Sequence, residues 1–192
     1  MQNIIMLSER KLSLILSKFE GPDSTYRLIQ LSISPAIVSD MLLQARKDIK
    51  QKTVYNFGCA NGRFAIGSAL LGATAVYGFD IDRGLIDIAK ENAIHVQHKT
   101  GYQLSNVCYW RLQDVMKLKS KCDTVIQFPP INADLLFFMK ALEIGKNIYS
   151  IHKADREEEI KQLSKKYKVR IVKIKRYTLK KGFLDEVIFV VA

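Results

Sequence analysis

The sequence predicts an α/β fold: a mostly parallel sheet of seven strands, covered by helices on both faces and ending in an antiparallel hairpin. Between residues 53 and 167, short runs rich in β-branched and aromatic residues alternate with amphipathic helical stretches. That alternation is typical of a parallel sheet, because each helix returns the chain to the start of the next strand. The pattern changes over residues 168–192, where two strand-like runs flank a Lys-Lys-Gly turn and predict the hairpin.

The first 50 residues predict helices in front of the sheet. Residues 5–19 place apolar side chains on one stripe of a short amphipathic helix. Ser34 and Pro35 supply an N-cap and a proline at the first helical position, which predict a second helix. We therefore expect one domain over the whole chain, in which an N-terminal helical extension, residues 1–50, precedes a core of residues 51–192.

The sequence of the core predicts strands and helices in alternation. Strands are expected at residues 53–58, 75–80, 106–112, 123–128 and 147–152, and helices at residues 63–72, 82–94, 132–145 and 155–167. Gly145 is placed to end the third of these helices. The fourth has acidic residues in its first turn and lysines in its last, the order that the helix dipole favours. The hairpin strands are expected at residues 168–179 and 183–192.

The charge of the chain points to a polyanionic partner. Lys and Arg number 30 against 19 Asp and Glu, a formal net charge of +11, and much of the excess lies between Lys165 and Lys181. Such a field attracts RNA or DNA, so we expect that segment to contact nucleic-acid phosphates. A generally basic proteome, or lysines that protect an edge strand from aggregation, would produce the same excess.

The chain carries no sequence signal for secretion, a membrane span or a metal site. Its apolar runs are far shorter than the roughly 20 residues of a membrane helix. The apolar stretch near the start is too short, and too charged on both sides, for a signal peptide. Cys59, Cys108 and Cys122 show no paired spacing, which argues against a disulfide framework and a zinc site. We expect a cytoplasmic protein without a bound metal.

A glycine turn follows the first predicted strand. Gly58, Ala60 and Gly62 have the spacing of a G-x-G-x-G turn with alanine in the middle, which lets backbone amides approach a ligand at the start of a helix. Asp80 ends the second strand, where a carboxylate can accept hydrogen bonds from ribose hydroxyls. It could also cap the next helix, a role that Asp82 could fill equally well. Together, the turn and the acid favour a nucleoside cofactor.

At these positions the chain resembles the Rossmann-like S-adenosylmethionine (SAM) methyltransferases. More narrowly, it resembles the small archaeal and eukaryotic RNA methylases that act on adenine N6 of small-subunit ribosomal RNA. The resemblance rests on residues 56–82, 123–131 and 149–153 and on the closing hairpin. It implies SAM as cofactor, ribosomal RNA as substrate, Asp80 on the ribose and Asp114 near the adenine. The cofactor-binding positions that it implies are Asn56, Gly58, Ala60, Gly62, Asp80, Ile81 and Asp114.

Some positions depart from the family's pattern. Asn56 stands where the family's first strand ends in an acid, and Ala60 stands at the middle glycine. An upstream Glu-Gln-Tyr-Pro-Thr motif, which helps to close the family's site, is matched at best by Ile-Gln-Leu-Ser-Ile at residues 29–33. Departures that concentrate in the site rather than the core indicate a changed substrate or lost chemistry.

The catalytic motif departs furthest. The family's fourth strand ends in Asn-Pro-Pro-Phe, whose asparagine oxygen and first prolyl carbonyl accept hydrogen bonds from the target amine while the aromatic ring stacks on the flipped base. The matching residues are Phe128, Pro129, Pro130 and Ile131, which keep the prolyl carbonyl but lack the side-chain acceptor and the stacking face. Gln127 could supply the missing oxygen only through a bulge, because neighbouring strand side chains point to opposite faces.

We expect a SAM-dependent RNA methyltransferase of the adenine-N6 type with an altered catalytic motif. The alternative is a catalytically inactive relative that binds RNA or a protein partner. A nicotinamide-dependent oxidoreductase fits the glycine turn but not the Pro-Pro motif or the hairpin. Eukaryotic relatives work with a small zinc-binding activator protein, so the resemblance also implies such a partner. Near the site, His152 either caps the next helix or meets RNA phosphate, and Trp110 is expected to pack in the core in preference to stacking on a base.

Overall fold

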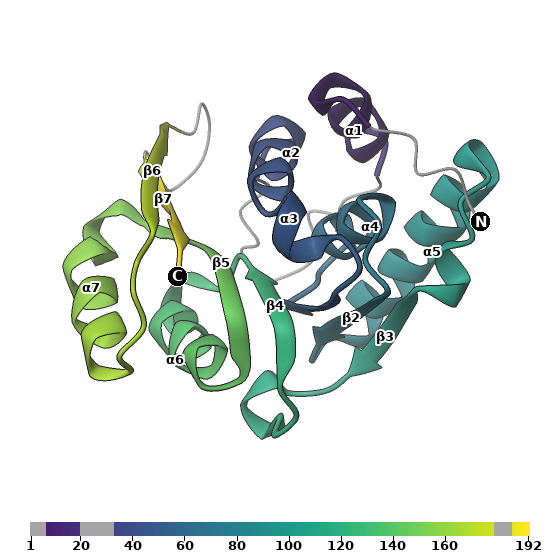
Figure 1. Ribbon diagram of the computed structural model, residues 1–192. Coiled ribbons are helices and arrows are strands. Elements are labelled where there is room, and N and C mark those ends of the chain that lie inside the picture. Colours follow the sequence, from purple (N-terminus) through teal and green to yellow (C-terminus); the bar gives the residue numbers. More distant parts are fainter. Residues whose placement is uncertain (1–6, 20–32, 179–185) are drawn as a thin grey trace.

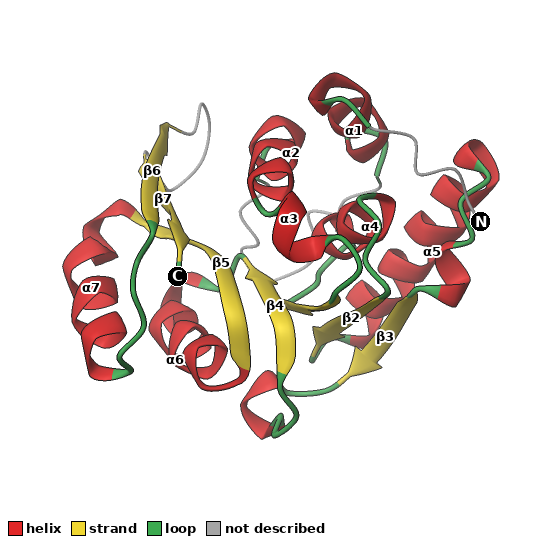
Figure 2. Ribbon diagram, viewed as in Figure 1, coloured by secondary structure: helices red, strands yellow, loops and turns green. Residues whose placement is uncertain are grey.

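The computed structural model describes residues 7–19, 33–178 and 186–192. They form a seven-stranded sheet in the order β3-β2-β1-β4-β5-β7-β6. The strands are β1 (Thr53–Phe57), β2 (Ala75–Asp80), β3 (Cys108–Leu112), β4 (Cys122–Gln127), β5 (Gly145–Lys153), β6 (Lys173–Thr178) and β7 (Glu186–Val191). Strands β1 to β5 are parallel, whereas β7 lies antiparallel between β5 and β6. The predicted fold class is confirmed (Figure 1, Figure 2).

Helices precede, connect and follow these strands. They are α1 (Glu9–Leu16), α2 (Pro35–Gln44), α3 (Arg46–Ile49), α4 (Arg63–Leu70), α5 (Arg83–Thr100), α6 (Asp134–Ile144) and α7 (Glu157–Lys166), with short 3-10 turns η1 (Leu104–Asn106), η2 (Val115–Lys117), η3 (Ile131–Ala133) and η4 (Ala154–Arg156). The β3–β4 crossover contains only η2 and its loop, while the crossovers from β1, β2 and β4 contain α-helices. Figure 1 shows α1 to α5 on one side of the sheet and α6 and α7 on the other.

Strand alternation divides the core between these two sides. In β1, Val54 packs in the larger cluster, which includes Phe64 of α4. Its neighbours Tyr55 and Phe57 belong to a second cluster that includes Phe138 of α6. Because successive strand side chains point to opposite faces, the position of a residue in a strand decides which helices it meets.

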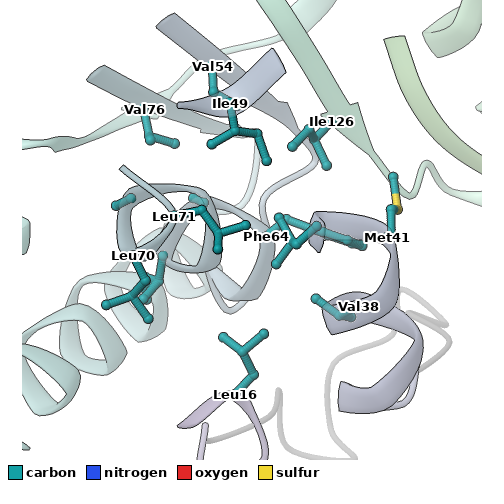
Figure 3. Close-up of a cluster of buried hydrophobic side chains, with 14 of the residues drawn as sticks. Leu16, Val38, Met41, Ile49, Val54, Phe64, Leu70, Leu71, Val76 and Ile126 are labelled. Carbon is teal, nitrogen blue, oxygen red and sulfur yellow. The ribbon is translucent and has the colours of Figure 1, made fainter. Parts of the chain in front are cut away.

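The larger cluster joins the N-terminal helices to the sheet. Figure 3 shows Leu16 of α1 and Val38 of α2 near Phe64 of α4, and all three are buried. Gly67 permits the close approach of α2, since a Cβ at this position would lie 2.3 Å from Leu42 Cδ1. Burial of each large apolar side chain contributes about 1.5–3 kcal/mol, so α1 and α2 are part of the packed core.

Local caps decide where α1 and α2 begin. Ser34 Oγ accepts a hydrogen bond from Ile37 N at 3.3 Å and Pro35 opens α2, as predicted. Ser8 Oγ accepts one from Lys11 N at 3.3 Å, so α1 begins at Glu9. The predicted helix over residues 5–19 was too long at both ends within the described part of the chain.

Helix α5 is longer than predicted. It was expected to end at Ile94, but it continues to Thr100, and Gly101 with a φ of 75° terminates it. Val96 is buried and continues the apolar stripe, so packing on the sheet extends the helix through a polar stretch.

Some predicted features fall in parts of the chain that the structure does not describe. The Lys-Lys-Gly turn at residues 180–182 and most of the upstream stretch at residues 29–33 lie outside the described residues. Within the described residues, no helix is long and apolar enough to cross a membrane. The three cysteines are buried and unpaired, and burial raises the pKa of Cys108 and of Cys122 to about 12.

Candidate cofactor and substrate site

The predicted motifs gather where the parallel strands end. Phe57, Asp80, Leu112 and Gln127 are the last residues of β1 to β4. Because the strands are parallel, these ends lie along one edge of the sheet, where open α/β sheets bind ligands. The glycine turn, Asp114 and the Pro-Pro motif each begin one or two residues beyond a strand end.

Asp80 connects the end of β2 to the turn after β1. Its Oδ2 accepts a hydrogen bond from Ala60 N at 3.0 Å, and its Oδ1 accepts one from Asp82 N at 3.1 Å. Burial raises the pKa of the Asp80 carboxyl, against the lowering effect of these amides. Asp82 is the cap of α5, because its Oδ1 accepts a hydrogen bond from Leu85 N at 3.2 Å. A carboxylate can accept about four hydrogen bonds, so Asp80 retains capacity for ligand hydroxyls.

The glycine turn has a left-handed backbone at three positions. Gly58, Ala60 and Gly62 have φ angles of 58°, 48° and 80°. Glycine adopts this region freely, whereas alanine does so at a cost of roughly 1–2 kcal/mol. A second contact holds the turn to β2, since Cys59 N donates to Phe79 O at 2.8 Å. The turn therefore keeps the conformation that glycine spacing favours, with strain at Ala60.

Trp110 fills the space that two glycines leave open. A Cβ at Gly62 would lie 2.8 Å from Trp110 Cη2, and a Cβ at Gly78 would lie 2.7 Å from its Cε3 and Cζ3. Trp110 is half-buried and packs against the larger core cluster. It is a packing residue, as predicted, and Gly62 serves both the tryptophan ring and the turn.

Asn56 offers a buried acceptor on β1. Its Nδ2 donates to Ile126 O at 3.1 Å, whereas its Oδ1 is buried without a hydrogen-bond partner among the described residues. An unpartnered buried polar atom costs about 1–3 kcal/mol, so a donor on a ligand that reached it would be bound favourably. Asparagine thus keeps one oxygen of the acid expected at this position.

Apolar surface lies beside Asp114 at the ends of β2 and β3. Ile81 is 70% exposed and Leu112 is 45% exposed, and Leu112 is the sheet partner of Asp80. Gln113 N donates to Asp80 O at 2.9 Å, which holds the loop after β3 against β2. Asp114 itself caps η2 through its Oδ1. Exposed apolar side chains beside a carboxylate suit a flat heterocycle that carries an amino group.

The Pro-Pro motif leaves β4 as an ordered turn. The Pro130 carbonyl accepts a hydrogen bond from Ala133 N at 3.0 Å, whereas no amide N–H of the described residues donates to the Pro129 carbonyl. Phe128 and Ile131 are half-buried and pack against the larger core cluster. The Pro129 carbonyl is therefore the acceptor that this motif retains.

Gln127 does not replace the missing asparagine. It pairs regularly with Phe57 of β1 and Ser150 of β5, so β4 has no bulge before the prolines. Its Nε2 donates to Ser150 Oγ at 2.9 Å, and the residue is fully buried. Because Phe128 follows it on the opposite face, the Gln127 amide points away from the position that the asparagine would occupy.

His152 continues this buried chain, and both sequence-based interpretations of it are wrong. Its Nε2 lies 2.6 Å from Ser150 Oγ, and its Nδ1 lies 3.5 Å from Asp134 Oδ2. The residue is 1% exposed, so it neither caps a helix at the surface nor reaches RNA. Burial lowers the pKa of His152, while Asp134 opposes that shift. Asp134 begins α6, so this chain of contacts ties the loop after the prolines to β5.

Sequence reasoning missed two residues near the glycine turn. Arg63 donates from Nη1 to Ile33 O at 3.1 Å, while its Nε is buried and has no partner in the described part of the chain. A cation at the first position of α4 opposes the helix dipole, and that signal could have revealed it. Phe137 of α6 would lie 3.6 Å from a Cβ at Gly58, and no feature of its local sequence sets it apart.

Part of the basic C-terminal segment forms internal ion pairs. Lys175 Nζ lies 2.5 Å from Asp40 Oδ2, and Arg176 pairs with Glu157 and Glu186. These two cations are less available for phosphate than the sequence alone indicates.

Comparison with known proteins finds relatives over most of the chain. Residues 39–137 match the family model described as ribosomal protein L11 methyltransferase. An uncharacterized protein of Methanocaldococcus jannaschii is 35% identical over 77% of this chain and 72% of its own length. The rRNA N(6)-adenosine-methyltransferase METTL5 of Danio rerio is 31% identical over 75% of this chain and 73% of its own length.

A solved structure extends the similarity. The structure of a protein from Pyrococcus horikoshii, described as a candidate RNA methyltransferase, matches with a TM-score of 0.83 at 26% identity. The match covers 97% of this chain and 96% of that chain. It therefore reaches well beyond residues 39–137.

Proposed function

The chain belongs to the Rossmann-like, SAM-dependent methyltransferases, and from that premise we propose that it transfers a methyl group to the N6 amine of an adenine in ribosomal RNA. The relatives similar over most of both lengths include an rRNA N(6)-adenosine methyltransferase, whereas the ribosomal protein L11 methyltransferase model covers only residues 39–137. The net charge of +11 also favours RNA over a protein as the substrate. We place this activity in the cytoplasm.

The residues at the strand ends fit SAM, which supplies a methyl group on a positively charged sulfur. We propose that the turn of residues 58–62 and Asn56 hold its methionine end, that Asp80 accepts hydrogen bonds from its ribose, and that Ile81 and Asp114 meet its adenine. Asp80 has acceptor capacity left, and no described residue donates a hydrogen bond to Asn56 Oδ1. The observation that carries this assignment is the hydrogen bond from Ala60 N to Asp80, which joins the two predicted cofactor motifs.

The Pro129 carbonyl is the proposed acceptor for the target amine. Bound SAM would supply the methyl group, and the Pro129 carbonyl would accept a hydrogen bond from the amine N–H and so orient the nitrogen lone pair toward that group. Orientation can contribute roughly 7–11 kcal/mol to a well-aligned displacement. Phe128 offers no second acceptor, and the loss of one orienting contact lowers a rate by about 10²–10³-fold, by analogy with an oxyanion-hole donor. Because the motif lacks this second acceptor, we expect either a slow enzyme or an enzyme that acts on a different target.

Phe128 also favours a second candidate, a catalytically inactive relative that binds RNA or a protein partner. This candidate keeps the fold and the basic surface but transfers no methyl group. The two candidates differ in one measurable respect, which is the appearance of methylated nucleosides in RNA treated with the protein and SAM.

A small zinc-binding activator protein is a further proposed partner, on the family resemblance alone. Zinc would then belong to that partner. In the described part of this chain, no group of three or more His, Cys, Asp or Glu residues could hold a metal ion.

Titration calorimetry tests the cofactor assignment. We expect saturable one-to-one binding of SAM and of S-adenosylhomocysteine, because both carry the ribose and adenine that the strand-end residues recognise. If neither compound produces a heat of binding up to millimolar concentration, both the cofactor assignment and the proposal that the chain is an enzyme are contradicted.

A further inference from the structure

Two rows of side chains cover the face of β1, β2 and β3 opposite to α4 and α5. Sheet register aligns Tyr55, Tyr77 and Tyr109 in one row and Phe57, Phe79 and Arg111 in the next. The helices that contact β2 and β3 from the other face are α4 and α5. On the face with the two rows, the β3–β4 crossover of the described chain contributes only η2 and its loop. Tyr55, Phe57 and Phe79 are buried, whereas Tyr77 and Tyr109 are half-buried and Arg111 is exposed, so the accessible part of this face lies over β2 and β3.

An arginine lies over two of these rings. The rings of Tyr77 and Tyr109 stack with centroids 5.0 Å apart and an interplanar angle of 24°. The guanidinium carbon of Arg111 lies 5.7 Å from the Tyr77 centroid and 5.9 Å from the Tyr109 centroid. Arg111 is exposed, and it forms no ion pair with a carboxylate of the described residues. Its charge is therefore held in place on a stacked pair without being neutralised.

A shallow pocket of about 250 Å³ opens beside Arg111. Its walls include Tyr77, Phe79, Arg111, Gln113, Lys117 and Lys119, and no carboxylate of the described residues lines it. The volume lies just below the roughly 300–1,000 Å³ of small-molecule sites and suits a group of the size of one nucleobase. The pocket adjoins the proposed cofactor site through Gln113, which precedes Asp114, whereas Tyr55 and Tyr77 place part of its wall in the middle of their strands.

We propose that this tyrosine-arginine surface, formed by Tyr77, Tyr109, Arg111, Lys117 and Lys119, binds an unpaired nucleobase of the substrate RNA. The base stacks on the guanidinium and tyrosine planes, and the two lysines pair with the neighbouring phosphates. Arg111, Lys117 and Lys119 form no ion pair with a carboxylate of the described residues. Three such cations around an aromatic floor complement a polyanion with flat bases, and they do not complement an apolar protein surface. The inference rests on the proposed function, because it takes RNA as the substrate.

Fluorescence anisotropy with a 12-nucleotide single-stranded RNA tests the surface directly. Arg111→Ala and Tyr109→Leu should each lower the affinity by about 10-fold, within the range measured for loss of one stacking contact. Replacing Lys117 and Lys119 by glutamine should reduce the slope of log affinity against log salt by roughly 1.4, since two phosphate contacts are lost. A duplex of the same sequence should bind more weakly, because its bases are not free to stack.

Arg10→Ala is the matched control, since it removes an exposed arginine from α1 on the opposite side of the sheet. It should leave the affinity unchanged, and all variants should bind SAM as the wild type does. Photocrosslinking with 5-iodouridine RNA should label Tyr77 or Tyr109. The inference would be overturned if Arg111→Ala bound RNA with unchanged affinity, or if crosslinks formed only at residues other than Tyr77 and Tyr109. This face would then be one that binds a protein partner. A wild type that binds no RNA would also overturn the inference. The proposed function is tested separately, by measurements of SAM binding and methyl transfer.

Discussion

The carboxylate of Asp80 accepts a hydrogen bond from the amide N–H of Ala60 at 3.0 Å, so the end of β2 holds the turn that follows β1. These two residues are brought together by the parallel pairing of β1 with β2. The same carboxylate is the proposed ribose acceptor. On that proposal, turn conformation and cofactor affinity are coupled through one side chain.

Asp80→Ala should weaken SAM binding by about 1.5–3 kcal/mol, the range for hydrogen bonds to a charged group. Titration calorimetry measures the change. Asp82→Asn is the control, because asparagine caps a helix as well as aspartate does. The Asp82 side chain is assigned only to the start of α5, and its backbone N–H can still donate to Asp80 in the variant. Equal SAM affinity in Asp80→Ala and the wild type would contradict the ribose assignment.

Ala60→Gly should stabilise the protein by up to about 1 kcal/mol, because glycine relieves the left-handed strain but gains entropy in the unfolded chain. Urea denaturation measures the free energy of unfolding. Gln51 has a φ of 59° outside the site, so Gln51→Gly should show a similar gain without any effect on SAM. A loss of stability in Ala60→Gly alone would mean that the alanine methyl group makes a contact worth more than the strain.

Phe128→Asn combined with Ile131→Phe should restore the second acceptor and the stacking face. If the wild type is an adenine-N6 methylase slowed by these two positions, the rate on small-subunit ribosomal RNA should rise by about 10²-fold. Phe128→Leu is the control and should not raise the rate, because leucine also lacks an acceptor. A rate that falls in the double variant would show that Phe128 packs on a different substrate.

The stability of the fold should decrease as the pH falls below about 6.5, the ordinary pKa of histidine. Burial lowers the pKa of His152 in the folded state, so the unfolded chain binds the proton first. The contribution of His152 is complete above the unfolded pKa and is lost as pH falls toward the folded pKa, by at most about 1.4 kcal/mol per pH unit.

His152→Gln should flatten that part of the profile of unfolding free energy against pH, since glutamine does not titrate. His95→Gln is the control, because His95 is exposed on α5 and takes no part in the buried contacts of His152. A wild-type profile that is flat between pH 6.5 and 5 would contradict the assignment.

Local patterns in the sequence were enough for much of the fold. The bounds of β2 agree with those expected, because a β-rich run lies between two clear breaks. The start of α2 follows from Ser34 and Pro35, which act through neighbouring residues alone. The closing hairpin was predicted because the alternation of strands and helices ends after residue 167 and two strand-like runs follow.

Features that depend on contacts between distant segments could not be predicted. The burial of His152 depends on Asp134 and on the pairing of β4 with β5, neither of which has a local signal. That Trp110 packs was predicted, but its partners Gly62 and Gly78 follow only from the register of β2 with β3. The rows of tyrosines require the same register, so the tyrosine-arginine surface appears only in three dimensions.

Methyl transfer to RNA tests the central claim most directly. Total RNA from cells that lack this protein is incubated with the purified protein and isotopically labelled SAM, then digested to nucleosides and separated by mass spectrometry. We expect label in N6-methyladenosine from ribosomal RNA, and less label with Asp80→Ala at limiting SAM. Label in another nucleoside would keep the methyltransferase and change its target. If no nucleoside carries label while the protein binds SAM and RNA, the claim that this chain is an RNA methyltransferase is contradicted.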